Sequence, residues 1–251
     1  MGKAAQRVRG EHQKEVAKLF ESLSPRHNGW QVWQDFIHMA ACEISIRVDA
    51  STRRERAESY NRVSEKYTPA EKTVLAKMLA EVVDAMEENQ EQDFLGDLFM
   101  SMELGNDWKG QFFTPYNLCA MMARMECEGL PEKVAQEGWV AVNDPACGAG
   151  ATLIGTLAEC KRHGVRQDQV LFVAQDLDMI AAQMCYIQLS LLGVAGYVCI
   201  GDTLAHPCIT IDPRGLIPAP GQNIWYTPGF CIEPWSFRRL LARPCKPKKG
   251  D

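Results

Sequence analysis

The sequence lacks several features that would place it in well-known classes of protein. None of its apolar runs approaches the 18 residues that a membrane-spanning helix needs, so we expect no membrane span. The N-terminus has no apolar signal core, which argues against secretion and leads us to expect a cytoplasmic protein. The net charge of −5 excludes a positive field over the whole chain that would attract nucleic acid.

Metal-ligand patterns are also missing, although the chain contains 10 cysteines and 5 histidines. No C-x-x-C pair occurs and the histidines show no ligand spacing, so we predict no metal site. Most cysteines lie within apolar runs, as Cys119, Cys185 and Cys199 do. This placement favours reduced thiols that serve as small core residues.

Residues 1–105 are predicted to form a helical N-terminal domain. Apolar residues recur at helical spacing in residues 30–44 and again in residues 74–83, and we interpret both stripes as core. Residues 68–71, Thr-Pro-Ala-Glu, carry the cap, the proline and the early acid that are typical of a helix start. Three roles stay open for this domain: covering the following domain, binding another subunit, or contacting DNA.

A glycine turn is the most informative segment of the chain. Residues 144–150 read Asp-Pro-Ala-Cys-Gly-Ala-Gly, after an apolar run at 139–142 and before a helical run at 151–160. A strand, a glycine turn and a helix bring backbone N–H groups and a positive helix end to a bound ligand. Gly148 and Gly150 would let the backbone approach that ligand closely. The alternative is a turn that only closes a loop.

Three further segments accompany this turn. Asp176 ends the next apolar run, where it is placed to bind ribose hydroxyls; the alternative is a helix cap, for which Asp178 is better placed. Asp202 follows a third β-rich run and is placed either beside an adenine amino group or in an ordinary turn. Upstream, residues 110–115 read Gly-Gln-Phe-Phe-Thr-Pro, where Thr114 suits a helix N-cap and Pro115 the first helical turn.

Helical and β patterns alternate in residues 106–205, which predicts a parallel α/β sheet. Residues 206–251 are predicted to form an irregular, proline-rich tail with one short helix at 236–241. The tail is basic at residues 238–249, with no acid between Glu233 and Asp251. This run is a candidate contact for DNA phosphates, and a solvated tail is the alternative.

The four segments together resemble the DNA adenine-N6 methyltransferases, and they are most similar to the modification subunits of type I restriction systems. The resemblance covers about residues 93–205 and includes the helix at 94–99. It implies a Rossmann-like methyltransferase sheet, S-adenosylmethionine as the cofactor, and either a specificity or other partner subunit or a homo-oligomer. An NAD-binding oxidoreductase has the same type of fold, but the sequences of residues 144–148 and 111–115 argue against it.

The resemblance also implies a set of cofactor-binding residues. Asp144, Cys147, Gly148 and Gly150 would line the methionine end of the cofactor, and Thr114 would help to hold its amino-acid group. The full predicted set is Phe113, Thr114, Pro115, Asp144, Pro145, Ala146, Cys147, Gly148, Gly150, Asp176, Leu177, Asp202 and Leu204.

One motif of these enzymes, Asn/Asp-Pro-Pro-Tyr/Phe after a fourth strand, is absent from the sequence. It matters because the flipped adenine must be held by stacking and by bonds to its exocyclic amine. Residues 227–230 keep one proline and the aromatic residue, which leaves Thr227, Pro228 and Phe230 as the candidates for a catalytic role.

The length of the remaining chain agrees with this gap. Only 46 residues follow Ala205, too few for three more strands with crossover helices. We therefore predict an α/β fold with a truncated methyltransferase sheet, which contains the half that binds the cofactor and lacks the half that binds the base. Two functions stay open: a DNA adenine-N6 methyltransferase, or an inactive cofactor-binding or assembly module of phage or mobile-element origin.

Overall fold

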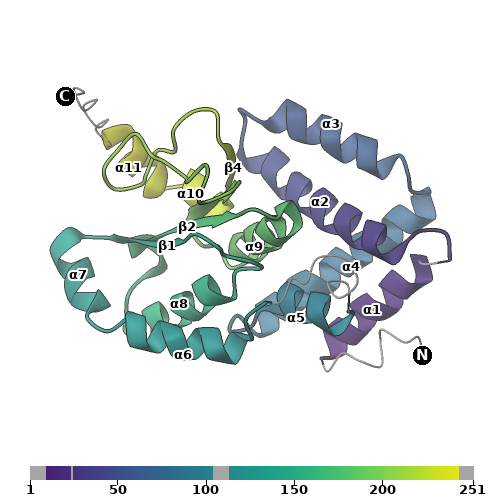
Figure 1. Cartoon of the computed structure of the whole chain (residues 1–251), viewed down its shortest axis with the longest axis horizontal. Helices are drawn as coiled ribbons and strands as arrows, with labels where there is room; N and C mark the ends of the chain where they lie inside the picture. Colours follow the sequence, from purple (N-terminus) through teal and green to yellow (C-terminus); the bar gives the residue numbers. More distant parts are fainter. Residues whose placement is uncertain (1–9, 24, 104–112, 243–251) are drawn as a thin grey trace.

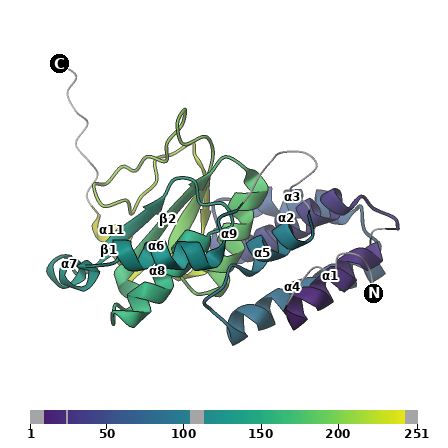
Figure 2. The ribbon, with the colours of Figure 1, turned by 60° about the horizontal axis from the view of Figure 1, so that its bottom comes forward.

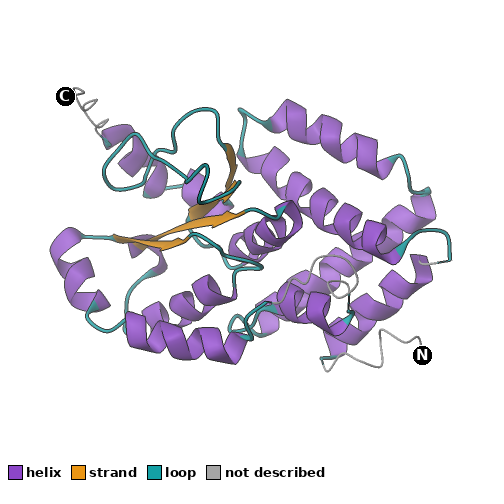
Figure 3. Ribbon diagram, viewed as in Figure 1, coloured by secondary structure: helices purple, strands orange, loops and turns teal. Residues whose placement is uncertain are grey.

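Helices make up one end of the molecule and a small sheet with its covering helices makes up the other (Figure 1). This computed structural model describes residues 10–23, 25–103 and 113–242. The strands lie in a single layer between helices, as the colouring by secondary structure shows (Figure 3). No helix in these described ranges combines the length and the apolar character needed to cross a bilayer.

The N-terminal part consists of helices joined by short turns. They are α1 (Glu11–Leu23), α2 (Gly29–Val48), α3 (Arg53–Ser64), α4 (Pro69–Glu88) and α5 (Phe94–Ser101). Helices α1 and α4 lie side by side (Figure 2), and His12 of α1 contacts Glu81 of α4 at 2.7 Å. The predicted helix start at Thr68 is confirmed, because Thr68 and Glu71 form a reciprocal capping box in front of Pro69.

The α/β part begins after residue 113. Its elements are α6 (Tyr116–Glu126), α7 (Leu130–Glu137), β1 (Val140–Asp144), α8 (Ala151–Arg162), the 3₁₀ turn η1 (Gln167–Gln169), β2 (Val170–Asp176), α9 (Met179–Leu191), β3 (Gly196–Ile200), β4 (Asn223–Tyr226), α10 (Pro228–Cys231) and α11 (Trp235–Leu241).

The strand order is β1-β2-β3-β4. Strands β1, β2 and β3 are parallel, with Val140 opposite Val170 and Phe172 opposite Gly196, whereas β4 runs antiparallel to β3. The crossovers through α8 and α9 bring the carboxyl ends of the three parallel strands to one edge. The predicted α/β class, with a helical N-terminal part and a Rossmann-like sheet, is therefore confirmed.

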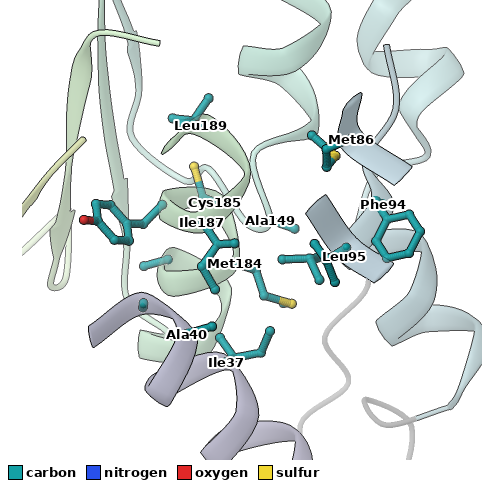
Figure 4. Packing of buried hydrophobic residues seen from close by; sticks show 14 of the residues in the cluster. Ile37, Ala40, Met86, Phe94, Leu95, Ala149, Met184, Cys185, Ile187 and Leu189 are labelled. Atoms are coloured by element: carbon teal, nitrogen blue, oxygen red, sulfur yellow. The ribbon is translucent and has the colours of Figure 1, made fainter. Parts of the chain in front are cut away.

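One hydrophobic core joins the two ends of the molecule. Ile37 and Ala40 of α2 lie close to Met184 and Ile187 of α9, and Leu95 of α5 points into the same cluster (Figure 4). A second, smaller core covers the other face of the sheet and includes Trp235 of α11. The domain boundary at residue 105 stays a prediction, but the main core runs across it.

The structure differs from the sequence predictions in three elements. The segment 206–242 adds a fourth strand, and this strand is antiparallel, so the sheet is mixed. Helix α3 was not predicted, because its sequence is largely charged and carries little helical periodicity. Helix α6 begins at Tyr116 with extended Pro115 as its N-cap, so the prediction of Thr114 as the cap is wrong.

Candidate cofactor-binding site

A cavity of about 240 Å³ lies where the turn after β1 meets the end of β2 and the segment before α6. Six of the predicted residues line it: Phe113, Thr114, Ala146, Cys147, Gly148 and Asp176. Five lining residues were not predicted: Asp93, Cys119, Ala149, Ala151 and Thr152. The sequence did carry a local signal for Asp93, since an aspartate directly before an apolar helix is a typical N-cap.

The turn after β1 has the tight conformation that its glycines permit. Gly148 and Gly150 have φ values of +53° and +101°, in the region that L-residues with a side chain rarely adopt. The backbone N–H of Cys147 donates to the carbonyl oxygen of Gln175 at 2.9 Å, which fastens the turn to β2. A Cβ atom at Gly150 would lie 2.9 Å from the sulfur of Cys185 in α9, so the turn also packs closely against that helix.

Asp176 couples the end of β2 to this turn. Its Oδ2 accepts a hydrogen bond from the backbone N–H of Gly148 at 2.8 Å, and its Oδ1 accepts one from Asp178 at 2.8 Å. The cap of α9 is Asp178, which accepts from Ile180 and Ala181. The alternative role of Asp176 as the helix cap is therefore excluded, and its carboxylate lies in the cavity wall.

The N-terminus of α8 opens onto the same cavity. Its N-cap is Gly150, which has no side chain to accept from the first-turn N–H groups. Those groups have no acceptor within the helix, and Ala151 and Thr152 of this turn line the cavity. The arrangement suits an anionic group such as the carboxylate of an amino acid, because the helix dipole adds a partial positive charge there.

Three carboxyl groups lie in or beside the cavity, which favours a ligand with a cationic centre. Burial raises the pKa of Asp93 to about 6, although hydrogen bonds from Gln188 and Gly96 oppose the shift. Burial also raises the pKa of Asp144, and the neighbouring Asp176 adds to the effect. A sulfonium cation together with an amino-acid carboxylate fits this combination of carboxylates and helix N–H groups.

Gln188 of α9 connects the glycine turn with the segment at the start of α5 through hydrogen bonds. Its Nε2 donates to Oδ1 of Asp93 and to the carbonyl oxygen of Ala149, both at 2.8 Å, and its Oε1 accepts from the N–H of Leu95 at 3.1 Å. Gln188 is fully buried, so these bonds are shielded from water. Through this one side chain, the start of α5 is positioned against the glycine turn.

The thiols in the cavity wall are structural rather than reactive. Cys147 shares a hydrogen bond with the thiol of Cys185, and together with burial this contact raises the pKa of Cys147 well above its usual value. Burial likewise raises the pKa of Cys119. Neutral thiols are poor nucleophiles, so the predicted role of cysteine as a small core residue fits these positions.

The third predicted segment reaches the glycine turn through a different residue from the one expected. Oδ1 of Asp202 accepts hydrogen bonds from the backbone of Leu204 and Ala205, and these bonds lower its pKa. Asp202 does not line the cavity, whereas the hydroxyl of the next residue, Thr203, donates to the carbonyl oxygen of Pro145. Asp202 therefore forms an ordinary turn, which was one of the two predicted alternatives. Its contact with a ligand beyond the cavity stays a prediction.

The other predicted residues do not line the cavity. This group consists of Pro115, Asp144, Pro145, Gly150, Leu177 and Leu204. Leu177 and Leu204 are 70% and 95% exposed, so their roles in cofactor binding stay predictions. Asp144 accepts from the N–H of Ala146 at 3.1 Å, and in this way shapes the turn from within.

The structure does not place Thr227, Pro228 and Phe230 at the cavity. The Oγ1 atom of Thr227 accepts from the N–H of Gly196 at 3.0 Å and donates to the carbonyl oxygen of Val194 at 2.6 Å. Gly196 begins β3, so this segment lies at the opposite end of the sheet from the glycine turn. Thr227 and Phe230 are fully buried away from the cavity, so neither side chain is placed to contact a base there.

Replacement of Thr227 by valine tests this structural assignment. We expect Thr227→Val to lower the free energy of unfolding by about 1–3 kcal/mol, because the buried N–H of Gly196 loses its acceptor. Ligand binding at the cavity should not change. Urea unfolding measures the first effect and calorimetry the second. Thr73→Val is the matched control, since Thr73 lies on an exposed helix surface and should change stability by less than about 0.5 kcal/mol.

Part of the predicted DNA-contact run packs within the protein. Arg238 donates to the carbonyl oxygen of Asp168 and lies over the ring of Trp235 at 4.3 Å, and Arg239 lies over Phe230 at 4.5 Å. Residues 243–249 of this run lie outside the described residues. The contact with DNA therefore stays a prediction for those residues.

Comparison with known proteins identifies a family for the part of the chain that contains this cavity. The model of a family described as N-6 DNA methylase matches residues 90–219, which is more than half of the chain and includes every lining residue of the cavity. No curated protein matches the sequence. A solved structure from Listeria monocytogenes, described as a class I S-adenosylmethionine-dependent methyltransferase, aligns with a TM-score of 0.49 at 14% identity over 85% of this chain. This chain spans only 57% of that protein.

The family match confirms two of the sequence predictions. The resemblance to adenine-N6 methylases is confirmed over a range that starts before Asp93 and ends beyond Asp202. S-adenosylmethionine is confirmed as the cofactor that belongs to this family. The chain is a member of the N-6 DNA methylase family.

Proposed function

We propose that this chain binds S-adenosylmethionine in the cavity between β1, β2 and α6, and that the bound cofactor serves N6 methylation of adenine in DNA. One observation carries the proposal: Asp176 and the first turn of α8 meet at the same glycine turn, with the carboxylate bonded to Gly148. Family membership supports methyl transfer as the reaction class.

Each part of the cavity has a distinct task in this proposal. The carboxylate of Asp176 accepts two backbone hydrogen bonds and has further lone pairs available. These lone pairs would accept hydrogen bonds from the ribose hydroxyls. The first-turn N–H groups of α8 would hold the carboxylate of the cofactor. Asp93 and Asp144 would favour its positive charge. When bound, the cofactor supplies an activated methyl group, and the protein aligns it with the acceptor.

The second candidate function is a cofactor-binding module that does not itself transfer the methyl group. The burial of Thr227 and Phe230 at the far end of the sheet favours it, because the segment after β3 that partly matches the missing motif then lies away from the cavity. Adenine would have to be held by other groups for transfer to occur.

A labelled-cofactor experiment separates the candidates. The chain would be incubated with methyl-labelled S-adenosylmethionine and unmethylated duplex DNA, with bound cofactor measured by equilibrium dialysis and N6-methyladenine by digestion and mass spectrometry. Binding with N6-methyladenine supports the methyltransferase. Saturable binding without transfer supports the module. Absence of binding contradicts both, and binding of NAD instead would point to an oxidoreductase.

The raised pKa of Asp93 predicts a pH dependence of cofactor affinity. Because this carboxyl has a pKa of about 6, it is ionised at pH 7.5 and becomes neutral as the pH falls through 6. We expect the affinity for the cationic cofactor to be about three- to tenfold lower at pH 5 than at pH 7.5. Calorimetry at the two pH values measures this change.

Asp93→Asn is the control for this pH effect. The amide keeps an oxygen that can accept from Gly96 and Gln188, but it carries no charge at either pH. The variant should bind weakly at both pH values and lose most of the dependence. An unchanged dependence in this variant would show that another group is responsible.

A further inference from the structure

A second cavity, of about 410 Å³, lies where the start of α3 meets β4. The turn before α3 lines it on one side, and residues 218–224 with Tyr226 line it on the other. Figure 1 shows the connection from α2 to α3 beside β4, in agreement with these lining residues. The cavity shares no lining residue with the candidate cofactor site.

Arg56 is a buried cation in the wall of this second cavity. It is only 8% exposed, and its guanidinium lies 3.5 Å from the centre of the Trp225 ring. Its Nη2 donates to the neutral Oδ1 of Asn223 at 3.1 Å, whereas its Nε is buried without an acceptor. Burial lowers the pKa of Arg56, and the carboxylates of Glu55 and Asp49 offset this shift only in part. A guanidinium stays charged in proteins, so an anion in the cavity would stabilise it.

Other hydrogen-bond donors in the wall also lack acceptors. The hydroxyl of Tyr226 makes no hydrogen bond within the described residues, and burial raises its pKa, so it stays a donor at neutral pH. Thr52 is the N-cap of α3 but makes no side-chain cap bond, because its hydroxyl donates to Asp49 at 2.8 Å. The N–H groups of the first turn of α3 therefore have no acceptor within the helix. This surplus of donors fits a ligand that carries several acceptor oxygens.

Two carboxylates also line the cavity, and neither pairs with Arg56. Burial would raise the pKa of Asp49, but hydrogen bonds from Ser51 and Thr52 lower it. Its oxygens are engaged by these donors at 2.6–2.9 Å. Glu55 is exposed. The two charges should reduce the affinity for an anion, so we expect weak binding of a small anion.

The first turn of α3 is unusually basic. Arg53, Arg54 and Arg56 lie at the N-terminal end of the helix, where the helix dipole disfavours cations. Arg53 donates to the backbone carbonyl oxygen of Ile46 at 2.9 Å, and Arg54 forms an ion pair with Glu58. A bound anion would compensate for this concentration of positive charge.

The second cavity lies at the same end of the sheet as the glycine turn. Asn223 is opposite Ile200 at the end of β3, and Ile200 is opposite Asp176 at the end of β2. Neighbouring strands lie about 4.8 Å apart, so the Cα atoms of Asn223 and Asp176 are about 10 Å apart across β3. An anion in this cavity would lie beside the carboxyl ends of the parallel strands.

We propose that Arg56, Tyr226 and the first turn of α3 bind a phosphate group in the second cavity. A phosphate group has oxygens enough to accept from a guanidinium, a hydroxyl and helix N–H groups at the same time. Inorganic phosphate and the backbone of a DNA strand both offer this chemistry. The proposal does not depend on cofactor binding or on methyl transfer.

Calorimetric titration of inorganic phosphate into the full chain at pH 7.5 and constant ionic strength tests the proposal. We expect saturable binding with a Kd of about 1 mM or lower. Arg56→Met should weaken it at least about tenfold, because methionine keeps an unbranched side chain over Trp225 but removes the charge and the donors. Arg62→Met is the matched control, since Arg62 is exposed on the same helix and does not line the cavity.

Thermal unfolding provides a second readout that needs no variant. Low millimolar phosphate should raise the Tm of the unmodified chain in a saturable way, and chloride at the same ionic strength should not. The absence of both saturable heat and this rise in Tm overturns the proposal. Equal losses of phosphate binding in Arg56→Met and Arg62→Met overturn it as well.

A short DNA duplex in the same titrations distinguishes the two sources of phosphate. Duplex binding that Arg56→Met weakens and Arg62→Met does not would identify the DNA backbone as the source. Binding of inorganic phosphate through Arg56, together with duplex binding that is absent or indifferent to Arg56→Met, would identify free phosphate. Either result supports a phosphate site in this cavity.

Discussion

Asp176→Asn is expected to weaken S-adenosylmethionine binding by roughly 10- to 100-fold while leaving the protein folded. The carboxylate accepts from Gly148 and Asp178 and faces the cavity, so the substitution removes a charged acceptor for the cofactor at the place where the turn is held. A hydrogen bond to a charged group contributes about 1.5–3 kcal/mol, which corresponds to this range of affinity. Calorimetric titration of the two proteins measures the ratio.

Asp178→Asn is the matched control for this prediction. Asp178 also loses its charge in the variant, only two residues away, but its Oδ1 caps α9 and does not line the cavity. Asparagine is a good N-cap, so stability should change by less than about 1 kcal/mol and affinity by less than about threefold. Equal losses in both variants would mean that general charge, and not the position of Asp176, governs binding.

Gly150→Ala is expected to lower the free energy of unfolding by about 2–5 kcal/mol and to abolish measurable cofactor binding. Gly150 has a φ of +101°, which strains any residue with a side chain, and the added Cβ would lie 2.9 Å from the sulfur of Cys185. Backbone strain costs about 1–2 kcal/mol and a close contact in a packed core about 1–3 kcal/mol more. The turn must shift to relieve the contact, and it carries the N-terminus of α8 with it.

Gly164→Ala separates the two contributions. Gly164 also has a positive φ, of +71°, but an added Cβ there meets no atom within 4 Å. This variant should lose only the backbone contribution of about 1 kcal/mol and should bind the cofactor normally. Chemical denaturation gives the stability of both variants. A Gly150→Ala protein as stable as Gly164→Ala would contradict the close packing of the turn against α9.

The parts of the fold that depend on local sequence were predictable. The capping box at Thr68, the cap at Asp178 and the buried run of β2 are each encoded within a few neighbouring residues. The glycine turn belongs to the same class, because its conformation requires glycine at fixed positions. For these elements, residue type and spacing were sufficient.

The parts that depend on distant contacts were not predictable. Asp93 is held at the cavity by Gln188, far along the chain, which donates to both Asp93 and the turn. Thr227 resembled part of a site in sequence, but its hydroxyl is used by the backbone at the start of β3. The pairing of β4 beside β3 is likewise fixed by tertiary packing, through Trp225 beneath Arg56.

We expect the carboxylates and N–H groups around the glycine turn to hold a sulfonium nucleoside. Calorimetric titration of S-adenosylmethionine into the unmodified chain at pH 7.5 tests it most directly. The structure predicts saturable binding of one molecule per chain that S-adenosylhomocysteine displaces. The absence of saturable heat up to millimolar ligand, or binding that Asp176→Asn leaves unchanged, would contradict the claim.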